Sequence, residues 1–95
     1  MNNITLIGRL ATDVDLQSVT GGSQVASFII AVDRNDSEAD FFRIKMWNSQ
    51  AEAAAENLVK GRRIAVKGSL RQDVYEKEGE ERRSVSVVAR RVEYL

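Results

Sequence analysis

The seven residues from Phe41 to Trp47, FFRIKMW, constrain the fold more than any other part of the chain. Side chains on a β-strand alternate between two faces. If this run is a strand, its first face is wholly apolar and consists of Phe42, Ile44 and Met46. Its second face places two aromatic rings around two positive charges, in the order Phe41, Arg43, Lys45 and Trp47. Burying unpaired charges is costly, so the run predicts a strand with one face in a core and the other exposed.

Period-two alternation recurs elsewhere and predicts four more strands. They cover residues 3–10, 25–33, about 63–75, and 83–89 with an extension to 95. Glycine and polar residues at 20–23 and 78–80 mark turns, and the polar segment 34–40 links the second strand to the third. Gly8 and Gly68 lie inside the first and fourth strands, where an interior glycine indicates a bulge or a sharp bend.

The pattern changes to a helical period after the third strand. Apolar residues then recur at positions i, i+3, i+4 and i+7, namely Ala51, Ala54, Ala55 and Leu58. Ser49 and Glu52 have the spacing of a capping box, and Gly61, directly after Lys60, is the expected helix stop. One short helix is therefore predicted between the third and fourth strands.

The predicted order β-β-β-α-β-β fits a single all-β domain over residues 1–95. Interior glycines suit strands that curl into a small closed barrel, and the five-stranded Greek-key barrel of this description is the OB-fold. OB-folds present their second and third strands to oligonucleotides. The fold class thus makes the exposed face of Phe41–Trp47 a candidate surface for binding an oligonucleotide.

Composition excludes several classes of function. The chain has no cysteine and no histidine, which removes thiolate chemistry, the commonest general base and the commonest metal ligand. We therefore expect no catalytic residue, no metal site and no cofactor. No apolar run approaches the roughly 20 residues of a membrane span, and the first residues do not resemble a signal peptide, so a cytoplasmic protein is expected.

The net charge is zero, with 14 basic and 14 acidic residues, which at first argues against a nucleic-acid partner. The acidic residues gather in predicted loops, whereas many basic ones fall on predicted strands or their ends, so a positive groove is possible. An exposed aromatic and basic face suits single-stranded nucleic acid, which offers both flat rings and phosphates. The alternative is that these aromatic residues pack under a loop or at a subunit interface.

Several stretches together resemble the bacterial single-stranded DNA-binding protein family over nearly the whole length. The matching stretches are 1–10, 25–28, 41–47, 57–61, 66–71 and 87–89. The resemblance implies an OB-fold that self-associates, usually as a homotetramer, and wraps single-stranded DNA without strong sequence preference. The corresponding role is the protection and organisation of single strands in DNA replication, recombination and repair, in association with the nucleoid.

The resemblance also implies which residues bind. Family positions matching Phe41, Trp47 and Tyr75 stack on bases, and the position matching Arg43 contacts the strand. Positions matching Lys60 and Arg71 are further candidates for strand contacts. With Lys45 and Lys67 added from the basic pattern, the predicted DNA-binding set is Phe41, Arg43, Lys45, Trp47, Lys60, Lys67, Arg71 and Tyr75.

The chain departs from the family in three places. The segment 34–40 is short and lacks an aromatic residue, and Asp73 and Val74 precede Tyr75 where the family is often basic. Family members usually continue into an acidic tail that recruits replication and repair proteins, whereas this sequence stops at Leu95, as expected of a truncated chain or a tailless relative.

A second hypothesis for the function is an oligomeric protein-interaction module on the same fold, such as a primosome accessory protein. An enzyme is the third.

Overall fold

The computed structural model describes all residues from 1 to 95, in six strands and one helix. The elements are β1 (Ile4–Leu10), β2 (Asp15–Ser18), β3 (Gln24–Asp33), β4 (Ala39–Trp47), α1 (Asn48–Asn57), β5 (Arg63–Lys77) and β6 (Glu80–Tyr94). The predicted all-β class, with one short helix between the third and fourth predicted strands, is confirmed. The short strand β2 was not predicted.

Five of the strands close into a ring. β1 pairs with β5, β5 with β6, and β3 with β4, all antiparallel. β6 runs parallel to β4 at Ile44 and Lys45, and β1 turns onto β3 at Arg9 and Leu10, which completes the ring. β2 adds to the outer side of β3. This closed five-stranded ring confirms the predicted OB-fold barrel.

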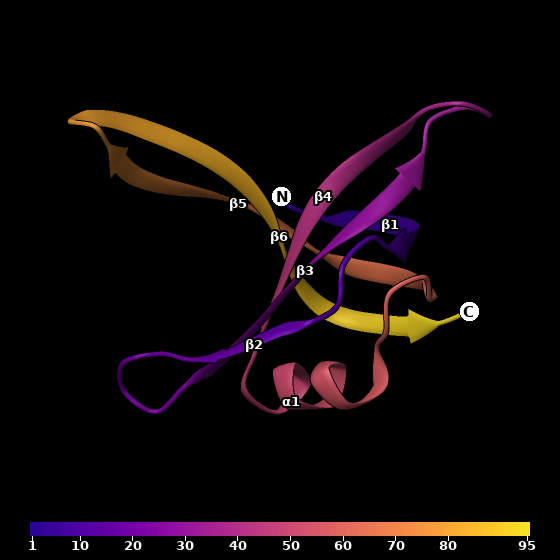
Figure 1. Cartoon of the computed structure of the whole chain (residues 1–95), viewed down its shortest axis with the longest axis horizontal. Helices are drawn as coiled ribbons and strands as arrows, with labels where there is room; N and C mark the ends of the chain where they lie inside the picture. The colour runs from indigo at the N-terminus through magenta and orange to yellow at the C-terminus, as the bar shows by residue number, and fades with distance from the viewer.

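Two long hairpins leave the barrel at the same end and diverge, as Figure 1 shows for β3–β4 and β5–β6, while α1 lies toward the other end. Pairing in the β5–β6 hairpin continues to Lys77 and Glu80. Glu78 and Gly79 then form a two-residue turn with φ of 54° and 79°, the geometry that matches strand twist in tight hairpins. The loop predicted at 78–80 is confirmed at Glu78 and Gly79, whereas Glu80 already belongs to β6.

The core lies inside the ring, on the side that alternation predicts. Ile44 and Met46 of β4 are buried, and Phe42 packs against them from a half-buried position. Phe28 of β3, expected in the core from its parity, is buried as well. Leu70 shares the inward face of β5 but is exposed. The pairing of β1 with β5 ends two residues earlier, at Gly68.

The two interior glycines lie where strands approach one another closely. A Cβ atom on Gly68 would stand 2.0 Å from the carbonyl oxygen of Val88, and one on Gly8 would stand 2.5 Å from that of Ala31. The register of β5 and β6 also shifts between Lys67 and Gly68. The predicted bulge is therefore confirmed at Gly68, whereas the pairing of β1 with β5 runs through Gly8 without a register shift. No other residue fits at either position without a backbone shift.

The helix differs from its prediction at both ends. Trp47 occupies the N-cap position and no side chain caps the helix, so the capping box of Ser49 and Glu52 is wrong. Asn48 instead takes a left-handed φ of 54° and its Oδ1 accepts a hydrogen bond from the backbone N–H of Gln24 at 3.2 Å. That contact ties the start of α1 to β3 but caps none of the free backbone N–H groups of the helix.

At its other end α1 stops at Asn57, three residues before the predicted end at Lys60, because the chain becomes extended at Leu58. Ala51, Ala54 and Leu58 are buried as predicted, but Ala55 is exposed. The helix touches the barrel along a narrower face than its apolar pattern indicates. It is also too short and too polar to cross a membrane, and no other helix is present.

Candidate nucleic-acid interface

The outward face of β4 carries the pattern that the sequence predicts. We call this face the β4 stripe, and it consists of Phe41, Arg43, Lys45 and Trp47. Phe41 is 64% exposed and Arg43 is exposed, while Lys45 and Trp47 are half-buried. Alternate residues on a strand lie about 7 Å apart, so the stripe spans roughly 20 Å with an aromatic ring at each end.

The β5–β6 hairpin brings a second set of side chains to the stripe. Residues 71, 73 and 75 of β5 share one face because strand side chains alternate. The guanidinium carbon of Arg71 lies 5.8 Å from the centre of the Trp47 ring, and Asp73 pairs with Lys45. Tyr75, two residues farther along this face, is 47% exposed. Two hairpins remote in sequence therefore form one aromatic and basic surface.

A carboxylate lies inside this surface. Asp73 Oδ2 accepts hydrogen bonds from Lys45 Nζ at 3.1 Å and from the hydroxyl of the buried Ser86 at 3.0 Å. Asp73 Oδ1 is 3.9 Å from Arg71 Nε. The hydrogen bond from Lys45 lowers the pKa of Asp73 below its usual value, against the opposing effect of burial, so this carboxylate is charged at neutral pH. The sequence named Asp73 as a departure from the family but gave no sign of its partners.

Arg43 differs from the other basic residues of this surface. Lys45 and Arg71 each form an ion pair with Asp73, whereas Arg43 forms none. Its side chain points outward between Phe41 and Lys45. Arg43 is therefore the basic group on this surface that needs no rearrangement to meet a phosphate.

The unpredicted strand β2 enlarges the same region. It borders an open hollow of about 390 Å³ beside β4, lined by Gln17, Val19, Val25, Ser27, Lys45 and Trp47. All four residues of β2 are exposed, so the strand has no buried face and leaves no hydrophobic alternation in the sequence. Only its pairing with β3 reveals it, and Trp47 is one of the side chains that line the hollow.

Two predicted residues lie apart from the β4 stripe. Lys60 follows α1, and its backbone N–H donates to Asp13 Oδ1 at 3.3 Å. Lys67 stands opposite Thr5 and Arg91 in the register of β5, which β6 separates from β4. Neither side chain forms a hydrogen bond or ion pair with the stripe. Their roles in binding stay predictions.

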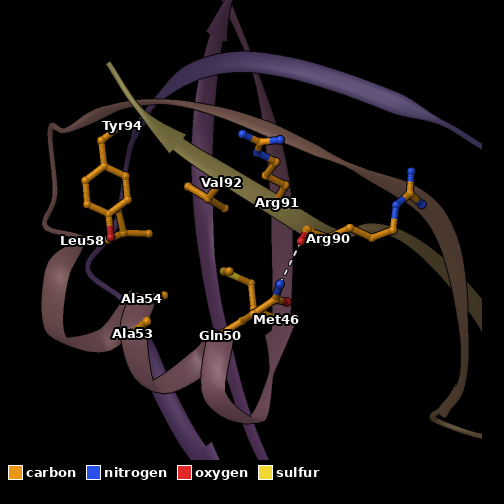
Figure 2. Close-up of a pocket in the computed structure, with 9 residues that line it drawn as sticks. All are labelled: Met46, Gln50, Ala53, Ala54, Leu58, Arg90, Arg91, Val92 and Tyr94. Atoms are coloured by element: carbon orange, nitrogen blue, oxygen red, sulfur yellow. Dashed lines mark hydrogen bonds between the residues drawn. The ribbon is translucent and has the colours of Figure 1, made fainter.

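A second hollow, of about 250 Å³, lies between α1 and the end of β6 (Figure 2). Met46, Leu58 and Val92 supply its apolar wall, and Gln50 closes one side by donating to the carbonyl oxygen of Arg90 at 2.8 Å. Figure 2 shows the guanidinium groups of Arg90 and Arg91 pointing away from it. Met46 faces the opposite side of β4 from the stripe, so this hollow does not belong to the candidate interface.

A closed five-stranded barrel with an aromatic and basic face on its central hairpins defines the class of OB-fold proteins suited to single-stranded nucleic acid. The particular family follows from comparison of the sequence with known proteins. The model of the single-strand binding protein family matches residues 1–95. The chain belongs to this family.

Individual relatives carry the same name. A single-stranded DNA-binding protein of Treponema pallidum is 34% identical over 102 aligned positions, which cover all of this chain and 58% of the relative. Single-stranded DNA-binding protein 3 of Clostridium acetobutylicum is 40% identical over 102 positions, covering all of this chain and 71% of the relative. The protein of that name from Paenarthrobacter aurescens is 43% identical over 83% of this chain and 53% of its own length. The chain thus spans between about half and three-quarters of these relatives.

Proposed function

We propose that this chain binds single-stranded DNA without catalysis and largely without sequence preference, as one OB-fold domain over residues 1–95. Such binding protects and organises single strands during replication, recombination and repair. The observation that carries the proposal is the meeting of the β4 stripe with Arg71 and Tyr75 on one surface, together with membership of the family. The names of the relatives agree with it.

Stacking and charge supply the affinity in this proposal. Phe41, Trp47 and Tyr75 offer ring faces, and base–aromatic stacking is worth about 1–3 kcal/mol per base. Arg43, Lys45 and Arg71 contact phosphates, and Lys60 and Lys67 extend the path along the barrel. A ring face accepts every base and a phosphate is common to every nucleotide, so this surface binds without reading sequence.

A titration with oligo-dT tests the function, because Trp47 is the only tryptophan of the chain. We expect strong quenching of its emission as a base stacks on the indole. We also expect the logarithm of the association constant to fall linearly with the logarithm of the salt concentration. The slope is about −0.7 for each phosphate that the protein neutralises on a single strand. Unchanged emission together with unchanged anisotropy of a labelled oligo-dT at saturating protein would contradict the proposal.

We further propose that the protein self-associates, as a homotetramer by the family resemblance. Leu70, Val74 and Val85 leave an exposed apolar patch on the β5–β6 hairpin. Residues Ile4 to Gly8 of β1 pair only with β5 and leave their other edge free. Exposed apolar side chains and an unpaired strand edge are surfaces on which a second copy can pack.

The same features support the alternative function, an oligomeric protein-interaction module such as a primosome accessory protein. In that case Trp47 contributes to an interface between subunits and not to DNA binding. The variant Trp47→Ala separates the two functions. Loss of oligo-dT affinity in an intact oligomer supports DNA binding, whereas intact affinity with a broken oligomer supports the alternative.

A further inference from the structure

The position of Asp73 is unusual for a surface that meets a polyanion. It is a carboxylate between two of the three basic residues of that surface, with Lys45 at 3.1 Å and Arg71 at 3.9 Å. The pair is partly sheltered, since the Asp73 side chain is 29% exposed and that of Lys45 is 26% exposed. Water and salt therefore screen this contact less than they screen the open ion pairs at the tip of the same hairpin.

The carboxylate is also fixed in place. Ser86, on the neighbouring strand β6, is buried and donates its hydroxyl proton to Asp73 Oδ2. If Asp73 turned away to release Lys45, this hydroxyl would lose its partner, and an unpaired buried polar group is costly. Asp73 thus remains beside Lys45 and Arg71 when a phosphate approaches.

Arg71 connects the carboxylate to the stacking surface. It reaches Asp73 on one side and lies over the ring of Trp47, 5.8 Å from its centre, on the other. A phosphate that attracts this guanidinium must compete with Asp73, and the movement also changes the ring face that Trp47 offers.

We propose that Asp73 sets the DNA affinity and its salt dependence by acting as a built-in counterion for Lys45 and Arg71, so that phosphates must compete with a fixed carboxylate for both cations. Arg43, which is unpaired, makes the first contact. This inference rests on the proposed function and assigns to Asp73 a role that opposes tight binding. It gives the protein weaker and more readily released binding than the same barrel without the carboxylate.

The test replaces the charge and keeps the shape, with Asp73→Asn. The repulsion between two like charges about 6 Å apart corresponds to roughly a hundredfold change in affinity at the effective dielectric constant near a protein surface, and to about threefold in bulk water. We therefore expect Asp73→Asn to bind between about 3- and 100-fold more tightly than the wild type. Two freed cations steepen the slope of log K against log salt by up to about 1.4, since each neutralised phosphate contributes about 0.7. We expect both changes in anisotropy titrations of labelled oligo-dT between low and high salt.

Glu81→Gln is the matched control. Glu81 also forms an ion pair on the β5–β6 hairpin, with Arg83 at 3.3 Å, so the net charge changes equally. It lies opposite Glu76 in the register and therefore on the other face of the hairpin from Asp73. We expect the affinity of Glu81→Gln to stay within about twofold of the wild type and its salt slope to stay unchanged, as a distant surface charge is screened.

A double-mutant cycle identifies the partner. Lys45→Ala should cost more affinity in the Asp73→Asn background than in the wild type, because in that background no carboxylate competes with phosphate for the ammonium group. If the asparagine variant does not fold, Asp73→Ser removes the same charge with a smaller side chain. Thermal unfolding of each variant establishes that it is folded.

The outcomes separate the two proposals. If the wild type does not bind oligo-dT, both the proposed function and this inference fail. If the wild type binds and Asp73→Asn gains no more affinity and no steeper slope than Glu81→Gln, the function stands and the role of Asp73 is overturned. A loss of affinity in the asparagine variant also overturns it, because Asp73 would then be a group that helps DNA to bind.

Discussion

The two tyrosines of the chain have nearly equal exposure but different surroundings. Tyr75 is 47% exposed and Tyr94 is 46% exposed. Tyr75 lies on the face of β5 that carries Arg71 and Asp73, the two residues that contact the β4 stripe. Tyr94 lies under Arg62, whose guanidinium carbon is 5.3 Å from its ring centre, and borders the hollow at the helix end of the barrel (Figure 2).

We therefore expect Tyr75→Ala to weaken oligo-dT binding by about 1–3 kcal/mol, which is roughly a 5- to 150-fold rise in Kd. Tyr94→Ala removes the same side chain at the same exposure and should change Kd less than about twofold. Anisotropy of a labelled oligo-dT measures both variants at one salt concentration. Equal losses in the two variants would show that Tyr75 has no special place in the interface.

Among the elements, β4 was predicted correctly residue by residue. Side chains on a strand with one buried face alternate between the core and the solvent, so the sequence alone shows which residues face inward. The helix was predicted less well. Its start depends on Asn48 bonding to the backbone of Gln24, and a contact between residues 24 positions apart cannot be read from local spacing. β2 was missed for a related reason, since an exposed strand is defined only by its partner.

The bend at Gly68 yields an element-scale prediction. Alanine there places a Cβ 2.0 Å from the carbonyl oxygen of Val88, and this backbone atom moves only if β6 moves. We expect Gly68→Ala to lower the free energy of unfolding by about 2 kcal/mol or more, and Tm by roughly 10 °C. Differential scanning calorimetry at one protein concentration measures this.

Gly22→Ala is the control for glycine loss itself. Gly22 has a φ of +84° but open space around its Cβ position, so alanine brings backbone strain without a clash and should cost about 1 kcal/mol. A Tm for Gly68→Ala at or above that of Gly22→Ala would mean that β5 and β6 do not approach as closely as the structure indicates.

At the scale of the whole molecule, the proposed self-association predicts a solution mass that is a multiple of the 10.6 kDa chain. Charging the hairpin patch with Val85→Asp should reduce that mass, because Val85 is 57% exposed in the single chain and a buried unpaired carboxylate is costly at an interface. Sedimentation equilibrium with and without oligo-dT measures this. A mass of one chain at all concentrations would exclude a stable oligomer.

Local features of the sequence were enough to predict the barrel and the outward face of β4, which is half of the candidate interface. Strand alternation, the glycines at bends and the outward face of β4 are local properties, since each follows from side-chain parity or backbone freedom at known positions. The family resemblance added Tyr75 and Arg71 as matching positions. Neither source placed Arg71 over the ring of Trp47.

Only the tertiary structure decided how the surface is assembled. Lys45 and Asp73 are 28 residues apart, and their ion pair exists because β4 and β5 are both held beside β6 in the closed ring. Pairing between distant strands is set by the packing of the whole core. For this reason the basic residues could be predicted from the sequence, but the carboxylate that holds two of them could not.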